Sequence, residues 1–192
     1  MNAAGATTAI AGFFGVKLSE SYGPPVRVLR QPENLGPAAT RNRGLREARG
    51  DYLTFLDADD LYRPGKLSKQ LRILERDPEI DICLCVAQNF WETGLEEERD
   101  RYVAAGRLRM THHLSTLLAR RSVFDRVGPL DEATTGDTAD WFLRASDLEL
   151  RIEILDEVLL DRRMHAASLS HVDPMWDDYF KLLRARIDQQ RR

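Results

Sequence analysis

The sequence is short of cysteine, and this shortage narrows the classes of protein to which the chain can belong. Cys83 and Cys85 are the only cysteines among 192 residues, and no second Cys/His pair completes the four ligands of a zinc site. The two alternate in the apolar stretch "IDICLCV", which places them on one face of a strand. We therefore expect a buried, reduced pair, as is typical of a cytoplasmic protein.

Long apolar runs and surplus positive charge are also missing. No stretch approaches the roughly 18 apolar residues that cross a bilayer, and the N-terminal "AGATTAIAGFFGVKL" lacks the charged leader of a secretory signal. The net charge of −3 gives no electrostatic footprint for nucleic acid. The C-terminal "FKLLRARIDQQRR" is the one basic amphipathic segment; it is either a solvated terminal helix, over residues 173–192, or a peripheral membrane contact.

The length suits a single domain, residues 1–192, and its first half alternates strands with helices. The patterns predict strands over residues 26–31, 52–56 and 80–87, and helices over residues 36–50 and 63–78. This β-α-β-α-β order predicts an α/β fold with a parallel sheet wrapped by helices. Ligands of such sheets bind at the carboxyl ends of the strands.

The second half is less regular. The pattern predicts a charged loop with a helical piece over residues 91–110, and a strand with a short helix ending at Gly128 over residues 115–132. It further predicts a helix over residues 136–148, a strand over residues 150–155, a separate segment over residues 158–165 and the terminal helix over residues 173–192.

Three carboxylates, Asp57, Asp59 and Asp60, follow the apolar residues 52–56 within four positions. Carboxylates this close repel one another unless a cation lies among them. A polar turn in which Asp60 caps the next helix accounts for one aspartate, whereas a divalent cation accounts for all three. Such a cation binds phosphates on its other side, so the cluster at a strand end favours a nucleotide diphosphate site.

A second segment, "ENLGPAATRNRG", places Gly36 at a strand-to-helix turn and Arg41 and Asn42 in the helix. It is either an ordinary turn with a solvated arginine, or a turn whose backbone amides and guanidinium face a phosphate. Asp137 and Asp140 lie three apart, on one face of a helical first turn. Stabilisation of the helix terminus explains both, and the alternative is that one of them is a general base.

The histidines carry little information by themselves. His165 follows "LLDRRM" in a polar neighbourhood, and a single histidine is more often packed or exposed than a ligand. His112, His113 and His171 are expected at the surface.

Taken together, "NLGPAATRNRGLREARGDYLTFLDADDLYRPGKL", "LLARRSVFDRVGPLDE", "GDTADWFLRA" and "LLDRRMH" resemble a family 2 glycosyltransferase with the GT-A fold. The likeness runs from about Val26 to Ser170. The sequence is also similar to the subgroup of this family found in bacterial biosynthetic clusters. The resemblance implies a Rossmann-like, mostly parallel sheet. It also implies an inverting transfer of a sugar from a nucleotide diphosphate donor to an acceptor hydroxyl.

The resemblance also implies roles for single residues. In "DAD", Asp59 would bind Mg²⁺ or Mn²⁺ bridging the diphosphate, with Asp57 beside it toward the ribose. The histidine of "RRMH", His165, would complete the metal site. The donor-side turn and helix would supply Asn34, Gly36, Arg41 and Asn42.

The chain departs from the family pattern in two places. The family's Glu-Asp pair before "DW" is replaced by Asp137 and Thr138, so Asp137 is the first choice for the base and Asp140 the second. The family's opening strand, helix and second strand are missing. Residues 1–25 are atypical, so either the polypeptide is N-terminally truncated or residues 3–18 do something that the family does not.

Three functions stay open on the sequence. The first is a metal-dependent, inverting glycosyltransferase, the second a binding or assembly module that has lost catalysis, and the third a nucleotidyltransferase. The expected partners are a nucleotide-sugar donor and an acceptor of unknown identity. An exposed sheet edge favours a homodimer or a covering partner chain.

Overall fold

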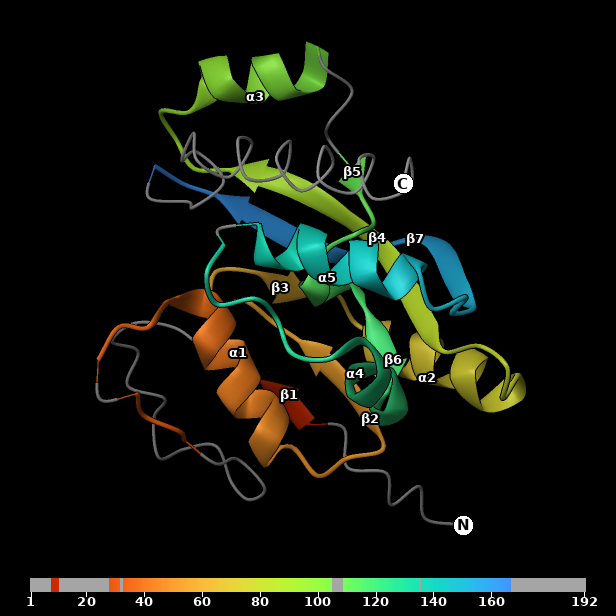
Figure 1. Cartoon of the computed structure of the whole chain (residues 1–192). Helices are drawn as coiled ribbons and strands as arrows, with labels where there is room; N and C mark the ends of the chain where they lie inside the picture. The colour runs from red at the N-terminus through yellow and green to blue at the C-terminus, as the bar shows by residue number, and fades with distance from the viewer. Residues whose placement is uncertain (1–7, 11–27, 32, 105–108, 135, 167–192) are drawn as a thin grey trace, which may run out of the picture.

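The computed structural model of the chain describes residues 8–10, 28–31, 33–104, 109–134 and 136–166 (Figure 1). In this part of the chain seven strands form one sheet in the order β1-β2-β6-β4-β7-β3, with β5 paired to β4. The strands are β1 (Thr8–Ile10), β2 (Tyr52–Phe55), β3 (Leu61–Tyr62), β4 (Ile82–Trp91), β5 (Arg109–Met110), β6 (Leu118–Arg120) and β7 (Ile152–Met164). The helices are α1 (Gly36–Glu47), α2 (Lys66–Arg76), α3 (Glu96–Ala104), α4 (Arg121–Val127), α5 (Asp137–Ser146) and the 3₁₀ helix η1 (Leu114–Thr116).

The α/β fold class is confirmed, but the sheet is mixed rather than mostly parallel. Among the described strands, β1 pairs with β2 and β4 with β7 in parallel, while the other four pairings are antiparallel. The reversal at the centre comes from β6, which runs antiparallel to both β2 and β4, its neighbours on either side. The two-residue β3 turns back after the acid cluster and pairs with β7.

Helices pack against both faces of the central strand β4, so β4 is buried on both sides. Ile82 and Leu84 belong to a core with α1, α4 and α5, whereas Cys83, between them, packs with Leu74 of α2. Alternate side chains of a strand point to opposite faces, so an unbroken apolar run is what a central strand needs. Cys83 and Cys85 are free and buried, as predicted.

Strand β7 is longer than the sequence suggested. The sequence predicts separate pieces at residues 150–155 and 158–165, but one strand runs alongside β4, with register shifts next to Val86. Leu155 and Val158 pair with consecutive residues of β4, so Asp156 and Glu157 bulge out of the ladder. The bulge interrupts the apolar pattern without ending the strand.

The expected strand at residues 26–31 is wrong where the structure describes it. Residues 28–31 are not in a strand, and Val28 and Leu29 are exposed, so their apolar pattern does not face a core. The predicted helix at residues 173–192 lies outside the described residues. No helix in the described ranges is long and apolar enough to cross a membrane.

Candidate functional site

The acid loop, residues 57–60, leaves the carboxyl end of the buried strand β2. A hydrogen bond from Asp60 N to Asp57 O (3.1 Å) closes the loop into a turn. The backbone N–H of Asp57 donates to Ser115 Oγ of η1 (3.3 Å), which fixes the start of the loop. The carboxylates therefore lie at the strand end, where α/β folds bind ligands.

Arg41 is the cation that pairs with Asp57 of the acid loop. From α1 its Nη2 donates to Asp57 Oδ1 (2.8 Å), and its Nη1 donates to Asp137 Oδ2 (3.0 Å) on α5. Burial alone would raise the pKa of Asp57, but the neighbouring Arg41 guanidinium outweighs burial, and the pKa is lowered. Asp57 is therefore ionised in the folded protein.

Asp60 is the residue of the acid loop with a buried oxygen that has no hydrogen-bond partner among the described residues. Its side chain is buried, and Oδ1 accepts a hydrogen bond from Arg163 N (3.2 Å), while Oδ2 has no hydrogen-bond partner among the described residues. Burial, and then the charges of Asp57 and Asp59, raise its pKa to about 7. The alternative in which Asp60 caps the next helix is wrong, because α2 begins after Gly65 without any side-chain cap.

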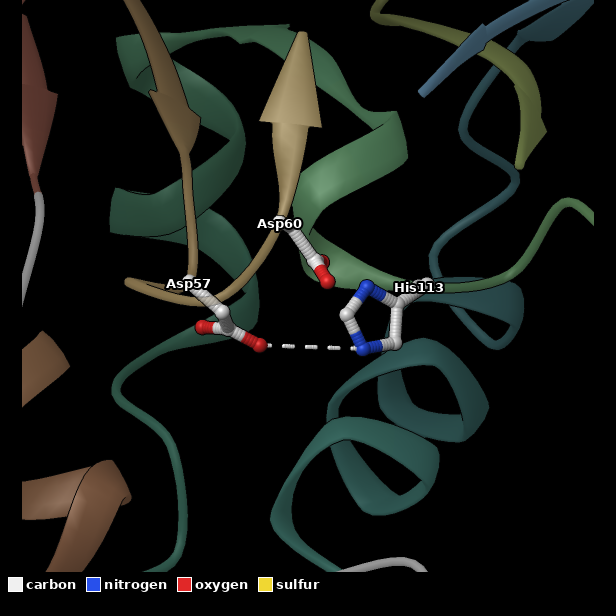
Figure 2. Close-up of side chains that lie close together, drawn as sticks. All are labelled: Asp57, Asp60 and His113. Atoms are coloured by element: carbon white, nitrogen blue, oxygen red, sulfur yellow. Dashed lines mark ion pairs between the residues drawn. The ribbon is translucent and has the colours of Figure 1, made fainter. Parts of the chain in front are cut away.

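His113 was expected at the surface, and this expectation is wrong. Its side chain is 14% exposed, with Nε2 3.8 Å from Asp57 Oδ2. Ligand atoms of Asp57, Asp60 and His113 all lie within 4.8 Å of one another. Figure 2 shows the three side chains close together, with the ion pair between Asp57 and His113 dashed. Nothing in the sequence marks this residue, because only the tertiary fold brings η1 beside the acid loop.

The ring of His113 is already partly engaged. Its Nδ1 accepts a hydrogen bond from Ser115 N (3.2 Å), so the neutral ring carries its proton on Nε2, facing Asp57. Burial lowers its pKa to about 4 in spite of the nearby carboxylate. A ring in this state suits a hydrogen-bonding neighbour of Asp57 better than a metal ligand.

His165 and Asp59, which the sequence predicts as metal ligands, lie together in the structure. The ring Nε2 is 3.0 Å from Asp59 Oδ2, although the residues are 106 positions apart. Their side chains are 25% and 38% exposed, so both are accessible from solvent. Beside Asp59 an open cleft of about 720 Å³ runs along Phe90 and Trp91, at the end of β4.

The donor-side residues predicted around α1 divide into a turn and a buried anchor. Asn34 Oδ1 accepts a hydrogen bond from Gly36 N (3.0 Å), and Gly36 has a φ of +82°, which glycine adopts without strain. Asn42 is buried, with its amide donating to Leu130 O (2.9 Å) and Glu132 Oε1 (2.8 Å). Asn42 thus anchors α1 to the segment around Leu130. A contact between Asn42 and the nucleotide-sugar donor stays a prediction.

The two candidate bases on α5 lie in different surroundings. Asp137 is buried at the first position of the helix, and burial raises its pKa although Arg41 opposes the shift. Asp140 pairs with Arg144 (2.8 Å), which also donates to Pro129 O (2.7 Å) and so ties α5 to the end of α4. Asp137 therefore belongs to the same ionic cluster as the acid loop, whereas Asp140 is engaged in helix packing.

Solved structures show the same fold. S. aureus TarS, residues 1–349 with UDP-GlcNAc, is 19% identical with a TM-score of 0.56, over 78% of this chain and 45% of that one. The mannosyltransferase PcManGT from Pyrobaculum calidifontis, with GDP-Man and Mn²⁺, is 18% identical with a TM-score of 0.54, over 73% and 40%. Glucosyl-3-phosphoglycerate synthase from Mycobacterium tuberculosis, with Mn²⁺, UDP and phosphoglyceric acid, is 17% identical with a TM-score of 0.52, over 79% and 54%. The fold is therefore the GT-A fold.

The sequence assigns the family. The model of glycosyl transferase family 2 matches residues 15–131, more than half of the chain, and the chain belongs to this family. An uncharacterized glycosyltransferase of Haemophilus influenzae is 44% identical over 35% of this chain and 23% of its own length. Another, from Methanocaldococcus jannaschii, is 24% identical over 71% and 50%. The chain thus spans half or less of the length of these relatives.

Proposed function

We propose that this chain transfers a sugar from a nucleoside diphosphate donor to an acceptor hydroxyl, with inversion at the anomeric carbon. One observation carries the proposal: the acid loop, His165 and the buried Asp137 converge at the carboxyl end of β2, although they come from distant parts of the sequence. The donors named with the solved relatives, UDP-GlcNAc and GDP-Man, support a nucleotide sugar as the substrate.

The site fits a divalent cation such as Mg²⁺ or Mn²⁺. Asp60 Oδ2 is a buried carboxylate oxygen without a hydrogen-bond partner among the described residues, and hard cations prefer such oxygens. Asp57, Asp59 and Asp60 would supply oxygen ligands and His165 a nitrogen. A bound cation would neutralise the charge that develops on the departing diphosphate.

A residue of the chain itself then activates the acceptor hydroxyl. Asp137 takes the proton from the acceptor hydroxyl, whose oxygen forms the new bond to the anomeric carbon. The bond from that carbon to the diphosphate breaks at the same time, and its electron pair leaves with the diphosphate. Attack opposite the leaving group inverts the anomeric carbon without a covalent enzyme intermediate.

A nucleotide titration tests the proposal. UDP, GDP and dTDP are titrated by calorimetry with and without Mn²⁺, against wild type, Asp59→Ala, Asp60→Asn and His165→Ala. Asp125→Asn is the matched control, since Asp125 is an exposed acid of α4, outside the site. We expect metal-dependent binding that falls at least tenfold in the three site variants and is unchanged in the control.

Two results would contradict the proposal. One is a folded wild-type protein that binds none of the three nucleotides. The other is binding that survives unchanged in both Asp59→Ala and Asp60→Asn, which would place any nucleotide elsewhere.

A further inference from the structure

Arg41 touches two carboxylates that have different tasks in the proposed reaction. Its guanidinium lies 2.8 Å from Asp57 on the donor side and 3.0 Å from Asp137, the proposed base. The arginine side chain is 13% exposed, so the contacts are screened little by solvent. One residue of α1 therefore joins the end of β2 to the start of α5.

A single positive charge here compensates two negative ones. Within the described part of the chain no other basic residue forms an ion pair with Asp137. The groups that act on Asp137 are Arg41 from α1, the backbone N–H of Thr138 on its own helix, and the charge of Asp57 after β2. Arg41 and the N–H favour its ionised form, whereas Asp57 and burial oppose it.

We infer that Arg41 is a positioning residue that orients Asp137 as the base and links it to the donor site through Asp57. The inference rests on the proposed function. A cation bound at Asp57 would compensate the charge of that carboxylate, and the guanidinium would keep Asp137 as its remaining carboxylate partner. Asp137 is then held ionised and in place once the donor is bound, so the base is prepared in response to the donor.

The link predicts that replacing Arg41 and replacing Asp57 shift the titration of Asp137 in opposite directions. Replacing Arg41 removes the cation that favours the ionised form of Asp137, so Asp137 titrates at higher pH. Replacing Asp57 by Asn removes a repelling charge and leaves Arg41 to Asp137 alone, so Asp137 titrates at lower pH. A purely structural arginine would not make the two variants diverge.

Carboxyl ¹³C NMR measures this without requiring turnover. The Asp137 signal, assigned by its loss in Asp137→Asn, is followed through a pH titration in wild type, Arg41→Gln, Arg41→Lys and Asp57→Asn. Arg46→Gln is the control, since Arg46 is an exposed arginine of the same helix. We expect an upward shift in Arg41→Gln, a smaller one in Arg41→Lys, a downward shift in Asp57→Asn and none in the control.

The same titration separates this inference from the proposed function. Adding Mg²⁺ with UDP to wild type is expected to shift the Asp137 midpoint downward, as Asp57→Asn does. No effect of Mg²⁺ and UDP, with the variant shifts intact, refutes the donor-driven link and the donor site but leaves the pairing of Arg41 with Asp137 standing. An unchanged midpoint in Arg41→Gln, or an upward shift in Asp57→Asn, overturns the inference whether or not the protein binds a donor.

Turnover gives a second readout. We expect Arg41→Gln to lower kcat about 10- to 100-fold at neutral pH, a part of what a general base contributes. The acid limb of its pH profile moves upward, and KM for the donor changes by less than about threefold above that limb. An unchanged profile with a raised donor KM would instead make Arg41 a donor ligand and overturn the inference.

Discussion

The pH dependence of the free energy of unfolding tests the charge state of Asp60 in the acid loop. Its pKa is raised from 3.8 to about 7, first by burial and then by Asp57 and Asp59. In the unfolded chain this carboxyl loses its proton near pH 4, whereas the folded protein retains it up to about pH 7. Between these values the folded state binds more protons, so the free energy of unfolding falls as pH rises.

The size of the effect follows from the pKa. At about 1.4 kcal/mol per pKa unit, the whole loss is about 4 kcal/mol, of which about 3 kcal/mol falls between pH 5 and pH 8. Asp60→Asn removes this loss, because an amide is neutral throughout and its oxygen can still accept from Arg163 N. We therefore expect wild type to lose about 3 kcal/mol more than the variant over this range.

Urea unfolding at pH 5, 6, 7 and 8, in the presence of a chelator, measures the difference. Other titrating groups, His113 among them, contribute to both proteins, so the comparison uses the difference between the two slopes. Asp125→Asn is the control and should follow wild type, since its carboxyl is exposed. Parallel slopes for wild type and Asp60→Asn would refute the reasoning, because they would mean that Asp60 titrates normally in the folded protein.

The remaining predictions concern the base and the anchor of α1. Asp137→Asn should lower kcat about 10²- to 10⁴-fold in a donor turnover assay, whereas Asp140→Asn should lower the free energy of unfolding by ~1 kcal/mol with kcat within about threefold of wild type. Equal losses of kcat in the two variants would contradict the assignment of Asp137 as the base. Asn42→Ala should cost about 1–3 kcal/mol by urea unfolding, because the buried N–H and C=O of Leu130 lose their partner. A loss below about 0.5 kcal/mol would mean that the anchor is dispensable.

Local pattern was enough to locate most helices and the acid loop. The predicted helix over residues 36–50 corresponds to α1, and the strand over residues 52–56 to β2. Both follow from short-range signals: Pro37 at a helix start, and an apolar run that stops at charged residues. The same kind of signal failed at residues 28–31, where an alternating pattern has no sheet to join.

Strand directions could not be read in this way. The short β6 lies antiparallel between β2 and β4, and this depends on how the chain turns through η1 before it. Strand β7 continues past its bulge because β4 offers a partner along its whole length. The pairing of a strand depends on the whole sheet, so the local sequence of β6 or β7 does not determine its direction or length.

The sequence by itself determined the acid loop, the helix that carries Arg41 and the position of the candidate bases, because each is a run of neighbouring residues. The tertiary structure decided which groups meet. It brought His113 to Asp57, His165 to Asp59, and Asp137 to Arg41 across 96 positions. The reason is physical: the ionisation of a carboxylate depends on burial and on charges within a few ångströms, and folding alone sets both.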